Sequence, residues 1–298
     1  MPTLPEMEGN HKGLPLQISS QIQQCPLNVP MKFSFSIRIL FTLAYCLLPL
    51  LFIGCLCSTS AVLASTLTER IAAFPEWNDK PTVQSVEGDL IYPDWMVGTW
   101  KLTSTLKEMV APLAPEVTTP GFEGNRDFLN IPITCPVRFV PNTILERNKA
   151  VVPFLSLPTK SLTTASVVSD RAFNGLSLAK AYLGDRVFRV WVDSRDPNRM
   201  TTKFRDNRKL FSFAIGRTVE QPDPDRFIAS ELFQQFFQAP EKPYKNQVET
   251  TTAYTHQPDG SVTADQFTAV YLNPPHPKAF VAGDRPVALY RYTLGFTK

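Results

Sequence analysis

The segment Ile91-Tyr-Pro-Asp-Trp-Met-Val-Gly-Thr-Trp-Lys-Leu-Thr-Ser-Thr-Leu106 combines a turn, a glycine and a strand, and it decides the fold class. From Trp100 onward, the apolar residues Trp100, Leu102 and Leu106 fall on one side, and threonines and a lysine fall on the other. A period of two with β-branched residues is typical of a half-buried strand. Gly98 precedes the strand, as expected for a sharp turn or a close approach of another backbone. The segment therefore predicts the first strand of a β-domain, with Trp100 in its core.

More segments with strand character follow along the chain. The strand-rich half begins in residues 165–183, and further strands are expected at 187–193, 200–204, 209–218, 227–237, 247–256, 261–272 and 287–297. Short sequential strands favour an all-β, antiparallel up-and-down barrel, because closure removes exposed sheet edges. Leu67, Ile71 and Phe74 fall at helical spacing and predict one short N-terminal helix that lids the barrel or covers its edge.

The tripeptide Gly98-Thr99-Trp100 resembles the opening of the first strand in the calycin barrels, the group that includes lipocalins and fatty-acid-binding proteins. This resemblance implies a barrel closed at one end by the tryptophan, with a late basic residue packed across it. Arg291 occupies the matching position, so Gly98, Trp100 and Arg291 are the expected closure residues. The threonine-aspartate-tyrosine motif of lipocalins is not visible in mid-chain, which argues against a standard lipocalin.

Two longer runs carry a second resemblance. They are Arg171-Ala-Phe-Asn-Gly-Leu-Ser-Leu-Ala-Lys-Ala-Tyr-Leu183 and Val192-Asp-Ser-Arg-Asp-Pro-Asn-Arg-Met200. Both are similar to sequences of an uncharacterised family of cyanobacterial and plastid proteins of the thylakoid lumen. Since that family has no assigned activity, the resemblance implies a compartment rather than a reaction.

The N-terminal part has the pattern of a targeting segment. Residues 1–30 are polar without apolar periodicity, and they are interpreted as disordered or as lying upstream of a true start at Met31. Residues 31–64 are predicted to form a secretory signal peptide, with a basic beginning, an apolar run at 39–57 and a cut after Ala64. The protein is therefore expected to be exported to the thylakoid lumen or the periplasm.

Two alternatives to cleavage stay open, namely lipidation at Cys55 and an uncleaved membrane anchor, because the apolar run is near the length that spans a bilayer. After the leader, residues 65–90 are expected to hold the short helix and a linker. Residues 91–298 form the predicted barrel domain, which is long enough to bury one sizeable core.

Composition excludes several function classes. A formal net charge of +3 and the lack of a long basic run argue against a nucleic-acid partner. Cys135 is the one cysteine after the leader, so no internal disulfide is expected, and an inert thiol is the favoured interpretation. His256 and His276 show no metal-ligand spacing, and no phosphate loop, nucleophile elbow or His–Cys pair stands out. No catalytic residue, metal ligand or cofactor is therefore predicted.

Arginines gather in the middle of the chain, at Arg171, Arg186, Arg189, Arg205, Arg208, Arg217 and Arg226. Arginine at alternating strand positions usually marks a solvated face. The sharper alternative is a basic rim that meets an anionic head group or an acidic partner surface.

An aromatic-lined interior with few polar groups suits an apolar ligand such as a lipid, isoprenoid or pigment. The expected lining residues are Phe188, Phe211, Phe213, Tyr290 and Tyr292. The favoured function is thus an exported, lipocalin-like barrel that binds an apolar small molecule. Two alternatives are a non-enzymatic accessory or assembly factor for a thylakoid membrane complex, and an isomerase or cyclase acting inside the barrel. Scarce histidines and the lack of a clear acid–base pair count against the enzyme.

Overall fold

The computed structural model describes residues 66–142, 166–239, 243–274 and 276–298, which are mostly strand with few helices. The predicted leader in residues 31–64, its start at Met31 and the alternative lipidation at Cys55 lie outside these residues. None of the helices that the structure describes is long and apolar enough to cross a bilayer.

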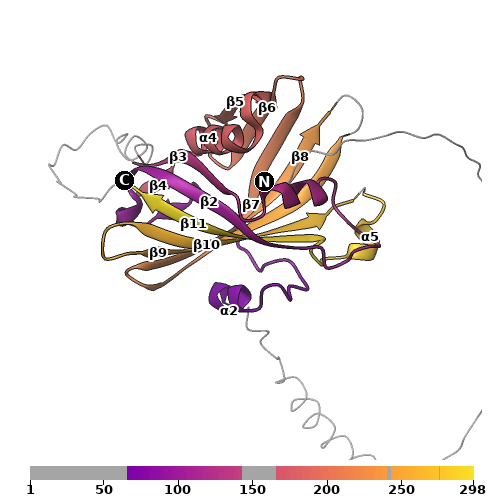
Figure 1. Cartoon of the computed structure of the whole chain (residues 1–298), viewed down its shortest axis with the longest axis horizontal. Coiled ribbons are helices and arrows are strands. Elements are labelled where there is room, and N and C mark those ends of the chain that lie inside the picture. Colours follow the sequence, from indigo (N-terminus) through magenta and orange to yellow (C-terminus); the bar gives the residue numbers. More distant parts are fainter. Residues whose placement is uncertain (1–65, 143–165, 240–242, 275) are drawn as a thin grey trace, which may run out of the picture. The chain divides into compact units, whose positions relative to one another are not determined.

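One curled antiparallel sheet dominates the described residues (Figure 1). Its strands are β1 (Ile91–Tyr92), β2 (Gly98–Val110), β3 (Pro132–Pro141), β4 (Val167–Ser169), β5 (Val187–Val192), β6 (Arg199–Phe204), β7 (Lys209–Asp223), β8 (Arg226–Gln238), β9 (Tyr244–His256), β10 (Val262–Leu272) and β11 (Ala288–Thr297). The helical segments are α2 (Leu67–Ala72), η1 (Asp94–Met96), η2 (Glu123–Phe128), α4 (Arg171–Leu183), η3 (Gly184–Arg186) and α5 (Ala279–Ala282).

The strand order is β1-β4-β3-β2-β11-β10-β9-β8-β7-β6-β5. From β5 to β11 the strands follow one another in the sheet as they do in the chain, which confirms an antiparallel, up-and-down arrangement. The strand that carries Trp100, β2, pairs with the last strand, β11, with Leu102 opposite Phe296. In the sheet that the structure describes, β1 and β5 are the two ends and do not pair with each other, so the expected closed barrel is a curled half-barrel.

Helix α4 lies across the opening of the half-barrel and packs on β3 near one end of the strand order and on β5 and β6 at the other. Its Leu176 and Leu183 pack with the core beneath β5, whereas Leu178 packs with the core beneath β2 and β3. The strand character expected in residues 165–183 is thus correct only for β4. The helix begins where the Asp170 side chain accepts a hydrogen bond from the backbone N–H of Phe173 (3.1 Å), a favourable N-cap.

Trp100 lies in the core, 1% exposed, and its indole N–H donates to the backbone carbonyl of Met96 (2.8 Å). The cation that packs over its ring is Lys298, with the ammonium 4.7 Å from the ring centroid. Arg291 lies further along β11, opposite Glu108, and binds Asp265 (3.0 Å) instead. Lys298 therefore takes the place expected for Arg291, because the β2–β11 register brings the end of β11 to the tryptophan.

Helix α2 occupies the place predicted for a short helix, and it begins with a capping box formed by Thr66 and Glu69. The segment after it packs on the outer face of the sheet, where Phe74 and Trp77 contact Phe267 with ring centroids 5.0 and 6.2 Å away. The outer face of β8–β10 is therefore covered, rather than the mouth or the edge of the half-barrel.

Candidate functional site

A cavity of about 350 Å³ lies between the inner face of the sheet and α4. Its apolar wall includes Leu90, Leu102, Phe139, Leu178, Phe233 and Phe296. The small inward side chains of Ser212 and Ala229 also line it, and their size leaves the space open. This volume falls in the range of small-molecule pockets.

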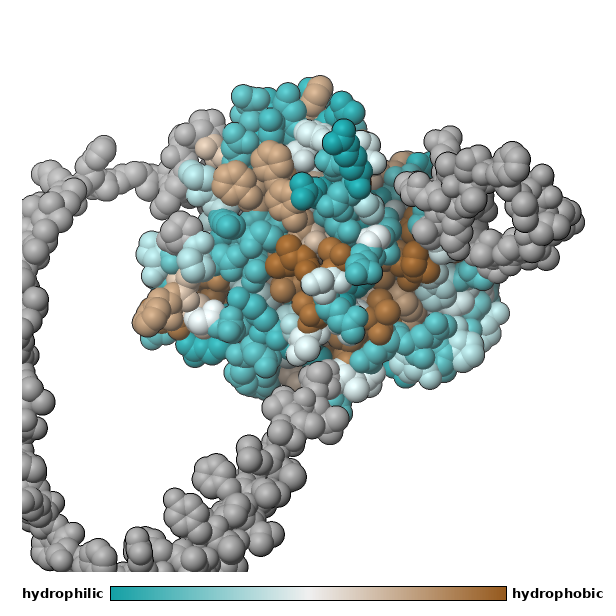
Figure 2. Space-filling view, turned by 180° about the vertical axis from the view of Figure 1, so that it is seen from behind, coloured by the Kyte–Doolittle hydropathy of each residue, from teal (hydrophilic) through white to brown (hydrophobic). Residues whose placement is uncertain are grey.

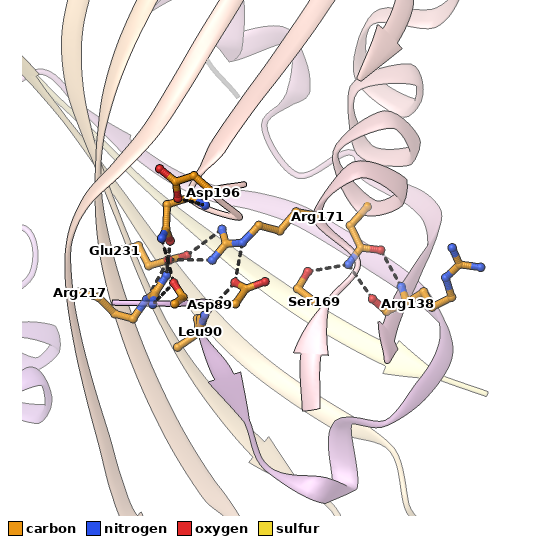
Figure 3. Close-up of polar contacts among 11 residues, drawn as sticks. Asp89, Leu90, Arg138, Ser169, Arg171, Asp196, Arg217 and Glu231 are labelled. Atoms are coloured by element: carbon orange, nitrogen blue, oxygen red, sulfur yellow. Dashed lines mark hydrogen bonds and ion pairs between the residues drawn. The ribbon is translucent and has the colours of Figure 1, made fainter. Parts of the chain in front are cut away.

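One end of the cavity carries charge. Arg171 projects from the first turn of α4, and its guanidinium donates to Glu231 on β8 (2.9 Å) and to Asp89 (2.8 Å) (Figure 3). Both Arg171 and Glu231 line the cavity. Their side chains are 14% and 10% exposed, so the pair lies in a largely desolvated place.

Glu231 also accepts a hydrogen bond from Arg217 on β7 (2.7 Å). Arg217 points this way because the β7–β8 register shifts between Ala214 and Gly216. Such a bulge turns the following side chains to the opposite face of a strand. Asn198 joins the group by accepting from Arg217 (2.9 Å).

The charges of this cluster balance, because Arg171 and Arg217 face Asp89 and Glu231. Burial by itself would raise the pKa of Glu231, but the attraction and hydrogen bonds of the two guanidinium groups outweigh it and hold the pKa below the usual 4.5. Glu231 is therefore ionised at neutral pH and already occupied by its partners.

The helix that bears Arg171 is fixed to β3 by a second set of polar contacts (Figure 3). The Asn174 side chain accepts from the backbone N–H of Arg138 (2.6 Å) and donates to the Ser169 hydroxyl (2.9 Å). The Arg138 guanidinium donates to Asp170, the residue that caps α4 (3.1 Å). These contacts set the position of α4, and hence of Arg171, relative to the cavity.

The floor of the cavity is polar without being charged. Thr250, Thr252, Gln266 and Thr268 lie on facing positions of β9 and β10 and line the space. The side-chain amide of Gln266 makes no hydrogen bond to any residue in the described ranges. Tyr254 closes this side, where burial, opposed by bonds to Thr252 and Tyr92, raises its pKa to about 12. Its phenol is therefore neutral and able to donate.

The five aromatic residues expected to line the interior are placed differently. Phe188 lies at a register shift in β5 and is 54% exposed. Phe211 and Phe213 share one side of β7, as their spacing indicated, but it is the outer side, because Ser212 between them lines the cavity. Tyr290 and Tyr292 are buried on the inner face, as expected, but they are not among the residues that line the cavity.

A second charge cluster lies on the outer face, beneath α2. Arg70 binds Glu249 through two hydrogen bonds of 2.7 Å, and the Tyr271 hydroxyl donates to the same carboxylate (2.7 Å). Glu249 is 0% exposed. The guanidinium also lies 4.2 Å from the ring of Trp77. This cluster is sealed and does not line the cavity.

The residues considered for metal or thiol chemistry are spread apart. Across the ranges that the structure describes, no three His, Cys, Asp or Glu side chains are grouped to hold a metal ion. His256 stacks on Trp95 (centroids 5.4 Å apart) and lies 3.1 Å from Asp225. Cys135 is buried, and burial raises its pKa, as expected for an inert thiol.

These features define a curled antiparallel half-barrel with an internal cavity that could hold a ligand. The model of a family described as a domain of unknown function, DUF6816, matches residues 84–298, and the chain belongs to that family. No curated protein and no solved structure matches the chain.

Proposed function

We propose that this protein is an exported carrier or receptor that binds an apolar small molecule, such as a lipid, isoprenoid or pigment, inside the half-barrel. The observation that carries the proposal is the cavity of about 350 Å³ with an apolar wall and a few convergent polar groups. The signal-peptide pattern in residues 31–64 supports export, to the thylakoid lumen or the periplasm.

The polar groups indicate what kind of apolar molecule fits. Because the Arg171–Glu231–Arg217–Asp89 cluster is balanced, it offers a ligand no net charge to neutralise. The Gln266 amide and the neighbouring threonine hydroxyls offer hydrogen bonds instead. The ligand is therefore mainly apolar, with one uncharged polar end such as a hydroxyl or a carbonyl.

The same geometry favours binding over acid–base catalysis. Glu231 faces the cavity, but two guanidinium groups occupy its oxygens and lower its pKa. A general base needs a pKa near the working pH and a free lone pair. The lowered pKa makes Glu231 a poor base, so an isomerase or cyclase is a weaker interpretation than a binding protein.

Native mass spectrometry of the protein purified from its source tests the proposal directly. A small apolar molecule should co-purify with the wild-type chain. Thr250→Phe, which fills the cavity, should lose it, whereas the control Thr263→Phe, an exposed position on the neighbouring strand, should keep it. The role of the cavity would be contradicted if Thr250→Phe kept the co-purifying molecule. It would also be contradicted if the wild-type protein carried no ligand and took up no fatty alcohol in solution.

A further inference from the structure

One part of the outer face of the sheet, which none of the described segments covers, has an unusual charge distribution. The segments 187–192, 199–204, 209–215, 232–238 and 244–248 contain no aspartate or glutamate. They contain five cations, which are Arg189, Arg199, Lys203, Lys209 and Lys245, and of these Arg199 pairs with Asp196 just outside the segments (2.9 Å). All five stand at outward positions, because the alternate residues such as Val190, Thr202 and Ser212 are buried. We call this surface the basic face.

Three of these cations form a row across neighbouring strands. Arg189 on β5 is directly opposite Lys203 on β6, and Lys203 is directly opposite Lys209 on β7. Like charges at directly opposite positions destabilise a sheet. None of the three makes an ion pair with a residue that the structure describes. Ion pairing among the described residues therefore does not account for this row.

A row of aromatic residues runs beside the cations. Trp191, Phe211 and Phe236 lie on β5, β7 and β8, and the rings of Phe211 and Phe236 stack with centroids 6.1 Å apart. Phe213 lies next to them, and Phe188 is 54% exposed. Arg189 packs over Trp191 (5.6 Å) and Lys203 over Phe188 (5.4 Å). The space-filling view from behind shows hydrophobic residues exposed near the middle of the visible face, with hydrophilic residues around them (Figure 2).

We propose that the basic face docks on the surface of an anionic lipid bilayer. Anionic head groups attract lysine and arginine near a membrane, and their long apolar stems let the charged ends reach the head groups while the stems lie deeper. Aromatic rings are favoured at the same level of the bilayer. The row of cations can therefore contact the anionic head groups while the row of aromatic rings lies at the same interfacial level of the bilayer.

The geometry favours a bilayer over an acidic macromolecule. The cations stand on a stiff sheet, and the rings lie against their neighbours instead of projecting as anchors or forming a pocket. Specific protein partners are usually held by such anchors in pockets, whereas a bilayer needs only a surface of charge and interfacial rings. The proposal does not depend on the cavity, and it goes beyond ligand binding.

Vesicle co-sedimentation of the full chain tests this proposal, with vesicles of phosphatidylcholine alone and with added phosphatidylglycerol. The key variant is Arg189→Gln/Lys203→Gln/Lys209→Gln. The control is Lys101→Gln/Lys107→Gln/Lys180→Gln, which removes the same charge from exposed positions elsewhere. Because the apolar run at 39–57 is present in all three chains, any binding due to it cancels in the comparison.

Wild type and control should bind the anionic vesicles more tightly than the neutral ones, with a difference that salt reduces. In the basic-face variant, the ratio of the affinity for anionic vesicles to the affinity for neutral vesicles should fall about 100-fold. It should also be more stable to denaturant than wild type, since the like-charge row is gone. That gain rules out misfolding as the cause of lost binding.

Three results would overturn the proposal: equal binding of wild type to both vesicle types, an unchanged anionic preference in the basic-face variant, or the same loss in the control. If the wild-type protein binds neither type of vesicle but binds poly-glutamate or heparin through the basic face, the partner of this face is an acidic macromolecule and not a bilayer.

Discussion

Among the residues that the structure describes, two buried charge clusters lie on opposite sides of the same sheet, and they differ in what surrounds them. Glu249 and Arg70 on the outer side are closed off by α2 and by Trp77, and the carboxylate is 0% exposed. Glu231 and Arg171 on the inner side stand at the wall of a cavity. The sealed cluster is thus surrounded only by protein, and the inner one faces a space that a ligand can enter.

The hydrogen-bond partners of the two buried carboxylates, Glu249 and Glu231, also differ. The Glu249 oxygens are shared among Arg70, Tyr271 and Thr251, so the carboxylate is saturated by the fold itself. Glu231 receives two arginines, and the Gln266 side chain, two strands away on the same cavity wall, makes no hydrogen bond to a described residue. The comparison indicates that burial of charge alone does not distinguish the two clusters, whereas the open space beside Glu231 does.

Breaking the sealed pair should have the largest effect. Glu249→Gln leaves the buried Arg70 guanidinium with only the exposed carboxylate of Asp79, 3.4 Å away, as a counter-charge, and we expect a loss of about 3 kcal/mol in the free energy of unfolding. The double variant Arg70→Met/Glu249→Leu should recover much of this loss, because no isolated charge remains. Chemical denaturation measures both, and a double variant less stable than Glu249→Gln would contradict the account of α2 as a cover over a paired charge.

Breaking the cavity pair should cost less stability but change binding. Glu231→Gln should lower the free energy of unfolding by about 2 kcal/mol, because Arg171 keeps Asp89 as a partner and Arg217 keeps the Asn198 side-chain oxygen. The cavity would then carry an excess positive charge. A fluorescent fatty-acid probe should gain affinity relative to the matching alcohol, which a displacement assay measures. An unchanged acid-to-alcohol ratio would argue against a ligand end near Glu231.

The sequence pattern predicted the sheet well, because a period of two survives in most strands. It predicted the strand at Trp100, the alternation of Tyr290 to Phe296 in β11 and the short helix at Leu67. It missed α4, where Asn174 and Gly175 interrupt the helical pattern. The signals that could have found it are the N-cap Asp170 and Gly184 just after the last turn, with a φ of 58°.

The sequence predicts a ligand-binding interior, but the residues that line the cavity were beyond what the pattern could predict, for two reasons. A bulge after Ala214 and a shift at Phe188 change which side of the strand faces inward, and neither is visible as a turn signal. The charged end also joins residues that are far apart in sequence, such as Asp89, Arg171 and Glu231. Only the fold brings them together. The aromatic side of β7, expected in the interior, faces outward because Ser212 lines the cavity instead.

The segment that covers the outer face packs closely against Gly216. A substitution at Gly216 should therefore disturb the outer side of the sheet, with a smaller effect than breaking either charge cluster. A Cβ at Gly216 would lie 2.1 Å from Cγ2 of Val83, in the segment that covers the outer face. Gly216→Ala should therefore lower the free energy of unfolding by about 1–2 kcal/mol and should leave cavity binding intact. Gly295→Ala, whose Cβ meets no atom within 4 Å in the described residues, is the control and should change stability by less than about 0.5 kcal/mol.

The smallest expected effect is a pH dependence that belongs to the inner cluster. Because the pKa of Glu231 is depressed in the folded protein, its stabilising contribution is complete above the ordinary pKa of 4.5 and is lost as pH falls through the lower, folded value. Denaturation midpoints measured from about pH 6 to about pH 3 should fall more steeply for wild type than for Glu231→Gln. Glu87→Gln, at an exposed position, should keep the wild-type slope. If the Glu231→Gln curve runs parallel to wild type, the two arginines do not hold that carboxylate in the charged state, and the balanced inner cluster loses its physical basis.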